Sequence, residues 1–237
     1  MTTPTQYTFT SSRSLRALSF SIHVTGLMFF AASFWWLPNI TNPLHNGFGG
    51  SYQFLTIIAL TISTITFGVG FLANLSLFAD LSLGQQLFAV KNWLSICATP
   101  LEVLVTILYW TLRTIDKKLV VPPDHEVPFI PDFGFHAIPA LMLTLDLMAL
   151  SPPWSMKILN VVLLDLVLTF SYWSWIEYCF SVNGWYPYPL LGSLSVSQKL
   201  LLSIVSAALM TGSTMVLESV HERVDQLIWR NTDIKSN

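Results

Sequence analysis

Thr56 and His136 are a pair of side chains whose chemistry suits nucleophilic acyl transfer. Thr56 ends the stretch FGGSYQFLT, and His136 ends the stretch PFIPDFGFH. An imidazole can take the proton of a threonine hydroxyl as its oxygen attacks an ester carbonyl, and can return that proton to the leaving alcohol. Water then clears the acyl-enzyme by the same route. Because a threonine hydroxyl is a weak nucleophile, the hypothesis requires the base as much as the nucleophile.

Each of these residues also has a purely structural interpretation. A threonine in a membrane helix commonly bonds the carbonyl one turn back, and a histidine near a membrane surface can bond a neighbouring carbonyl. Asp132 precedes His136 by four residues, so in a helix it would share the face of the imidazole and could orient it. Alternatively, Asp132 complements the dipole of a first helical turn. The backbone N–H groups of residues 49–51 are candidate oxyanion donors by proximity alone.

The composition is that of a membrane protein. Hydrophobic residues make up 53% of the chain and charged residues 10%, and mean hydropathy is +0.59, which leaves too little charge to solvate a globule of this size. The net charge of −2 is scattered in both signs, so we expect no nucleic-acid partner. Cys97 and Cys179 fall in apolar runs, which indicates neither a disulfide framework nor a metal site. We expect no cofactor.

Apolar runs of about 20 residues are long enough to cross a bilayer as helices, and six occur here. They predict an all-α, polytopic membrane fold with a single six-helix domain over 1–237 and short tails at about 1–14 and 221–237. The first run is too long and too aromatic for a cleaved signal peptide, so we expect it to be retained. The connection 113–131 contains four prolines and predicts a stiff, extended lid. The six runs are Leu15 to Leu37, Ser51 to Leu75, Asn92 to Leu112, Asp132 to Leu150, Lys157 to Phe180, and Gln198 to Val220.

The distribution of lysine and arginine predicts that both termini lie in the cytosol. Six spans put the termini on one side, and that side receives seven basic residues, namely Arg13, Arg16, Lys91, Lys157, Arg223, Arg230 and Lys235. The opposite side receives four, namely Arg113, Lys117, Lys118 and Lys199. We expect the endoplasmic reticulum or the plasma membrane as the compartment, with membrane lipids and a lipid substrate as partners.

The span count predicts that Thr56 and His136 lie at matching depth. Each is five residues inside a span that enters from the non-cytosolic side, counted from Ser51 and from Pro131, or roughly 7 to 8 Å at 1.5 Å per residue. Small and weakly polar residues share the helix face of Thr56, which predicts that this face points into the bundle. These are Ala59, Ser63, Thr66, Gly70 and Ala73.

Further ionisable residues lie within the predicted spans, where each is costly and should face the bundle interior. These are His23, Glu102, Asp146, Asp165 and Glu177. They are either structural hydrogen-bonding groups or an ion path, and the second interpretation makes a transporter the alternative function. Near the outer mouth, Arg113, Lys117 and Lys118 would attract a carboxylate or an anionic headgroup, although ordinary snorkelling to the interface explains each of them singly.

Several motifs resemble the androgen-induced protein family, which also includes the androgen-dependent regulator of tissue factor pathway inhibitor. FGGSYQFLT resembles the family signature Y-G-G-S-W-[KQ]-[FY]-L-T. Lys91-Asn92-Trp93 with Pro100, Tyr109-Trp110 with Asp116-Lys117, PFIPDFGFH, and NGWYPYPLL at 183–191 resemble further segments in the same order. The resemblance covers roughly residues 45 to 220.

The resemblance implies a multipass threonine hydrolase that cleaves fatty-acid esters of hydroxy fatty acids, with Thr56 as nucleophile and His136 as the essential histidine. Three departures from the family pattern concern Phe133 in place of a second histidine, Asp146 in place of a glutamate, and the respaced loop around Trp185. We take as candidate substrate-binding residues Asp132, Glu177, Trp185, Lys117 and Lys118.

Overall fold

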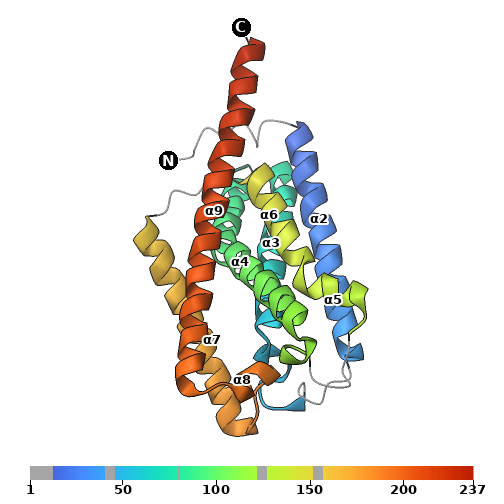
Figure 1. Cartoon of the computed structure of the whole chain (residues 1–237). Helices are drawn as coiled ribbons and strands as arrows, with labels where there is room; N and C mark the ends of the chain where they lie inside the picture. Colours follow the sequence, from blue (N-terminus) through green and yellow to red (C-terminus); the bar gives the residue numbers. More distant parts are fainter. Residues whose placement is uncertain (1–12, 41–45, 80, 122–126, 152–156, 237) are drawn as a thin grey trace.

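The computed structural model describes residues 13–40, 46–79, 81–121, 127–151 and 157–236, and within these ranges the chain is helical with no strand. The predicted all-α fold is confirmed. Five helices are long and apolar enough to cross a membrane, and a bent pair can supply a sixth span. The five are α2 (Arg13–Trp36), α3 (Leu55–Ala79), α4 (Leu81–Ile115), α7 (Ile158–Asn183) and α9 (Val196–Ser236), and Figure 1 shows them as a bundle.

The bent pair consists of α5 (Phe129–His136) and α6 (Ile138–Leu150), which meet at 42°. Pro139 lies in the first turn of α6 and has no N–H to donate to the carbonyl of Phe135, four residues back, which favours a bend in the helix at this point. Next to the bend, the carbonyl of His136 accepts a hydrogen bond from the Trp110 indole of α4 at 3.3 Å. The predicted fourth span is therefore broken directly after His136.

Helix α3 packs against α2, α4, α5 and α6. Its most extensive contacts are with α4, and α2 packs on it as well, while α7 packs mainly against α9. The small residues predicted to face inward from α3 are all buried, which confirms the predicted face. They let neighbouring helices approach closely, as at Gly70, where an added Cβ would lie 2.2 Å from the His23 ring of α2.

Two predicted boundaries differ from the structure. Helix α4 begins at Leu81, eleven residues before the predicted third span at Asn92, because Phe88 packs into an apolar cluster with Ala73, Leu77 and Leu150. The tail predicted from 221 is instead a continuation of α9, which runs for 41 residues. At about 1.5 Å per residue this is roughly twice the thickness of the bilayer hydrocarbon.

The predicted lid between α4 and α5 is only partly described. Pro122 and Pro123 lie outside the described residues, while Lys117–Leu119 form the short helix η4. Val120 and Val121 then turn inward and are buried. The described half of this connection therefore covers the bundle rather than extending away from it.

Candidate active site

Thr56 is the second residue of α3 and directly follows a turn that requires glycine. Gly49 and Gly50 have φ of +86° and +52°, a region that other residues adopt only with strain. They start the short helix η3 (Gly50–Gln53), which ends at an extended Phe54 before α3 begins. Thr56 is 7% exposed, so it lies almost entirely inside the bundle and away from open solvent.

The structural interpretation of Thr56 is poorly supported by its neighbours. Thr61, Thr64 and Thr66 each donate to the carbonyl four residues back, at 2.7 to 2.8 Å. At Thr56 that carbonyl belongs to Tyr52 and accepts from the Trp175 indole instead, at 2.8 Å.

His136 is held through its Nδ1 atom. Nδ1 lies 3.0 Å from the backbone oxygen of Asp132 and 3.1 Å from the carboxylate Oδ1 of the same residue. Both partners are acceptors, so the proton of a neutral imidazole belongs on Nδ1. Nε2 then carries the lone pair that a general base needs.

Tyr109 and Arg113 of α4 fix the position of Asp132 and the plane of the imidazole. The Tyr109 ring stacks on His136 with centroids 3.4 Å apart and planes 3° apart, and its hydroxyl donates to Asp132 Oδ1. Arg113 lies 2.8 Å from Asp132 Oδ2 and donates to the Tyr109 hydroxyl at 2.7 Å. Asp132 is fully buried, so this arginine balances a charge that water cannot reach.

Tyr188 brings a second hydroxyl next to Thr56. It directly precedes the short helix α8 (Pro189–Ser193) between α7 and α9, and its hydroxyl accepts a hydrogen bond from the Leu55 N–H at 3.0 Å. Burial raises the pKa of Tyr188, while its hydrogen bonds with Leu55 and with the Thr56 side chain lower it. The burial effect is the larger, so the hydroxyl stays protonated at neutral pH.

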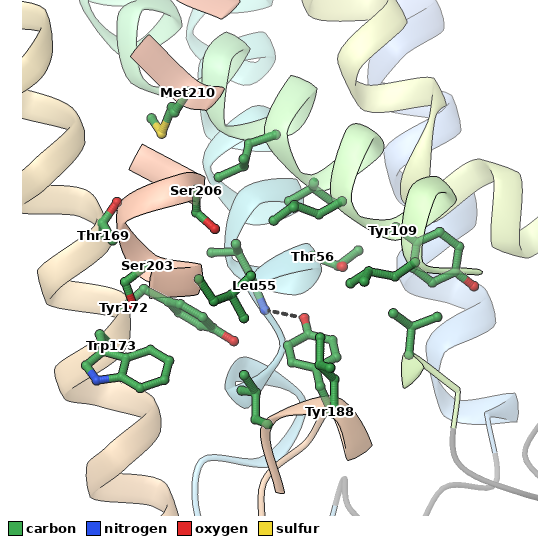
Figure 2. A pocket seen from close by; sticks show the side chains of 18 of the residues that line it. Leu55, Thr56, Tyr109, Thr169, Tyr172, Trp173, Tyr188, Ser203, Ser206 and Met210 are labelled. Carbon is green, nitrogen blue, oxygen red and sulfur yellow. Dashed lines mark hydrogen bonds between the residues drawn. The ribbon is translucent and has the colours of Figure 1, made fainter. Parts of the chain in front are cut away.

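Two cavities meet at Thr56. The larger, of about 140 Å³, lies among α3, α4, α7 and α9, and the smaller, of about 80 Å³, extends toward α5 and is lined by His136 and Asp132. The residues common to both are Thr56, Tyr109, Val120 and Tyr188. Figure 2 shows Thr56 beside Tyr109 in the larger cavity, with Tyr188 bonded to Leu55 next to them.

Thr56 and His136 therefore line the same cavity although eighty residues separate them in the sequence. Among the hydrogen bonds of the described residues, none joins the two side chains directly. Catalytic hydrogen bonds are often completed only when the substrate is present. The geometry brings together a hydroxyl, a base with its lone pair available, and the carboxylate that orients the base.

A family model described as FAR-17a/AIG1-like protein matches residues 18–222. The chain belongs to the FAR-17a/AIG1-like family. It is 31% identical over 214 residues to a UPF0641 membrane protein of Schizosaccharomyces pombe, covering 89% of this chain and 92% of that protein. It is 27% identical over 165 residues to the androgen-induced gene 1 protein of Homo sapiens, covering 64% of this chain and 68% of that protein. No solved structure matches the chain.

Two motifs that carry the family resemblance contact each other in this member of the FAR-17a/AIG1-like family. The Asn183 amide donates to the Phe48 carbonyl at 3.0 Å and to Gln53 Oε1 at 3.1 Å, while Phe48 N–H donates back to Asn183 Oδ1 at 2.9 Å. The Tyr188 hydroxyl adds a further hydrogen bond between the two segments by accepting from the Leu55 N–H. The segments FGGSYQFLT and NGWYPYPLL thus form one hydrogen-bonded unit under the larger cavity.

Four of the five predicted substrate-binding residues lie outside both cavities. Glu177 accepts from the Tyr186 hydroxyl at 2.8 Å, and Trp185 packs so closely on Gly47 that an added Cβ there would lie 2.5 Å from its ring. Lys117 and Lys118 lie in η4, whose neighbours Leu119 and Val120 line the larger cavity instead. The fifth, Asp132, reaches the smaller cavity but is engaged by three side chains, namely Tyr109, Arg113 and His136.

The predicted oxyanion donors do not occur among the residues that line either cavity. The Gly50 N–H is engaged within the turn, where it donates to the Gly47 carbonyl at 2.9 Å. Tyr109 and Tyr188 occupy the junction instead. The sequence analysis names them only within the motifs of the family resemblance and gives them no role, because a tyrosine near a membrane surface is usually an interfacial anchor.

The remaining intramembrane ionisable groups are paired inside the bundle. Asp146 lies 2.6 Å from Lys91 and 3.1 Å from His23, and all three side chains are fully buried. Thr211 donates to Asp165 at 2.6 Å, and Ser63 donates to Glu102 at 2.9 Å. Within the described ranges, no group of three or more His, Cys, Asp or Glu side chains could hold a metal ion.

Proposed function

We propose that the protein is a membrane-embedded carboxylic ester hydrolase that cleaves fatty-acid esters of hydroxy fatty acids. The observation that carries the proposal is that Thr56 and His136 line one cavity while both partners of the His136 Nδ1 atom are acceptors. The substrate class follows from the family resemblance. The lipid-facing helices and the apolar larger cavity are consistent with a substrate that reaches the site from the membrane.

In the proposed reaction, Thr56 Oγ1 attacks the ester carbonyl carbon while His136 Nε2 takes its proton. The tetrahedral intermediate collapses as the bond between carbon and alcohol oxygen breaks, and the imidazolium gives its proton to that oxygen. Water then attacks the threonyl ester with the same base, which releases the fatty acid and regenerates Thr56. Asp132 acts as a positioning residue that holds the imidazole and stabilises its protonated form.

The hydroxyl of Tyr188 is the donor best placed to stabilise the oxyanion in this scheme. It stays protonated at neutral pH and lies next to Thr56. A donor aimed at the developing negative charge typically contributes about 10²-fold or more to the rate.

The decisive experiment measures hydrolysis by the purified protein and its variants in detergent or vesicles. We expect Thr56→Ala to abolish turnover and labelling by an acyl-transfer probe, and His136→Ala to lower kcat by roughly 10²- to 10⁴-fold. Thr64→Ala is the matched control, because Thr64 lies on the same helix and bonds only its own backbone at 2.7 Å. Full turnover in a folded Thr56→Ala variant would rule the proposal out.

The alternative function, an ion or small-molecule transporter that uses intramembrane acids, gains no support from these contacts. Asp146, Asp165 and Glu102 each have a partner within the bundle. We further propose that the protein resides in the endoplasmic reticulum or the plasma membrane.

A further inference from the structure

The two cavities at Thr56 differ in which reacting groups they contain. Thr56 faces both, whereas His136 lines only the smaller one. An ester bound at Thr56 has two arms, the acyl chain on the carbonyl carbon and the alcohol chain on the ester oxygen. The structure therefore offers one compartment for each arm, with the carbonyl carbon at their junction.

The position of His136 decides which arm enters which cavity. The imidazole has to deliver its proton to the departing alcohol oxygen, so that oxygen and the carbons attached to it must lie on the His136 side. The acyl chain, which stays attached to Thr56 after the alcohol leaves, must then extend into the larger cavity. We infer that the larger cavity is the acyl-chain site and that Ser206 and Met210 of α9 set the acyl length accepted; this rests on the proposed function.

Met210 marks the far end of this cavity. It is 1% exposed and packs in one cluster with Leu101 of α4. Leu101 precedes Tyr109 by eight residues, which is about 12 Å along a helix, and Tyr109 belongs to the junction. Figure 2 shows Met210 at the opposite end of the view from Tyr188, with Ser206 between them. Ser206 lies one helical turn from Met210, so a larger side chain at position 206 would narrow the cavity before its far end.

The test compares two ester series, one varying acyl length on a fixed secondary alcohol and one varying alcohol length on a fixed acyl group. We expect Ser206→Leu to lower kcat/KM for long acyl chains relative to short ones, by about fourfold for each methylene excluded. Met210→Ala should shift the acyl preference in the opposite direction. The alcohol series should change little in either variant, since neither residue lines the smaller cavity.

Ser213→Leu is the matched control, because Ser213 lies two turns beyond Ser206 on α9 and bonds its own backbone at 2.8 Å without lining the cavity. It should leave both preferences as in the wild type. A changed alcohol preference in Ser206→Leu, or an unchanged acyl preference in both cavity variants, would overturn the inference while leaving the hydrolase intact. A wild-type protein that hydrolyses no ester of either series would overturn the proposed function instead.

A measurement on the unmodified protein keeps the inference testable if the variants fail to fold. Esters with a photoreactive diazirine at the end of the acyl chain or the alcohol chain are crosslinked and mapped by peptide mass spectrometry. The acyl-end probe should label segments 101–108 or 202–210, and the alcohol-end probe segments 37–40 or 129–136. The reverse assignment would refute the inference.

Discussion

At the scale of single residues, the proposed hydrolysis depends on which ring nitrogen of His136 carries the proton. The backbone oxygen and the carboxylate Oδ1 of Asp132 lie 3.0 and 3.1 Å from His136 Nδ1. The Tyr109 ring stacks on the imidazole and fixes its plane. An amide in place of the carboxylate could donate to Nδ1 and so move the proton to Nε2, where it would block the base.

We therefore expect Asp132→Asn to lower kcat by on the order of 10²-fold or more with a smaller effect on KM. The measurement is steady-state hydrolysis, together with the thermal unfolding midpoint of each purified variant. Asp116→Asn provides the control, because Asp116 is exposed and bonds the Lys118 N–H of η4. A folded Asp132→Asn protein with wild-type kcat would show that the carboxylate does not control the imidazole.

Residue-level inference from the sequence reached Thr56, His136 and the i, i+4 position of Asp132. It named Tyr109 and Tyr188 within family motifs but gave them no role, because their position at the junction of two cavities arises only when α3, α4 and the segment after α7 pack together. It gave Lys117 and Lys118 a binding role on charge alone, whereas the neighbouring apolar residues are the ones that line the larger cavity.

At the scale of elements, the contact between α2 and α3 depends on the absence of a side chain at Gly70. An added methyl group there would lie 2.2 Å from His23 Nε2, the atom that faces Asp146 at 3.1 Å. Asn74 holds the other ring nitrogen at 3.0 Å, so the imidazole has little freedom to move aside.

We expect Gly70→Ala to destabilise the protein by roughly 1 to 3 kcal/mol, as overpacking typically does, and to lower the thermal unfolding midpoint. Gly68→Ala lies on the same helix and would meet no atom within 4 Å. It should be neutral or slightly stabilising, since alanine favours a helix more than glycine does. Equal midpoints for the two variants would contradict this account of the helix contact.

The buried ion pair of α4 and α6 gives a second element-scale prediction. Lys91→Met would leave the Asp146 carboxylate buried without its lysine, beside only His23 and Ser151, and removing one partner of such a pair costs about 3 to 5 kcal/mol. The unfolding midpoint should fall sharply in the single variant and recover in Lys91→Met combined with Asp146→Asn. A single variant as stable as the wild type would show that the pair contributes nothing.

This pair also explains one difference between the sequence analysis and the structure. The sequence analysis places Lys91 on the cytosolic side, just before a span predicted to start at Asn92. In the structure residues 81–91 are helical, and the ammonium group is drawn inside by Asp146 of another helix, a partner that no local pattern identifies.

At the scale of the whole molecule, the order and number of helices follow from apolar run lengths, and five spans plus a bent pair are present. The start of α2 and the end of α9 lie at the same end of the bundle (Figure 1). With Lys91 removed from the count, six of the seven predicted basic residues remain on that side against four on the other.

We therefore expect the C-terminal end of α9 to face the cytosol. An engineered glycosylation acceptor placed after residue 237 should stay unmodified in cells. The control is the same acceptor inserted at Asp116, in the opposite connection, which should be modified. Glycosylation of the C-terminal acceptor alone would show that the termini lie on the non-cytosolic side, opposite to this prediction.

The walls of the larger cavity are mostly Leu, Val and aromatic side chains, with a few Ser and Thr hydroxyls, and the cavity lies among helices that lipid surrounds. Under the proposed function, a fatty ester would reach this cavity from the leaflet itself, where its abundance is a mole fraction of the surrounding lipid and not a molarity in water. Adding inert phospholipid at constant ester would then slow turnover by two-dimensional dilution, and the released acid would return to the same leaflet without crossing an aqueous phase.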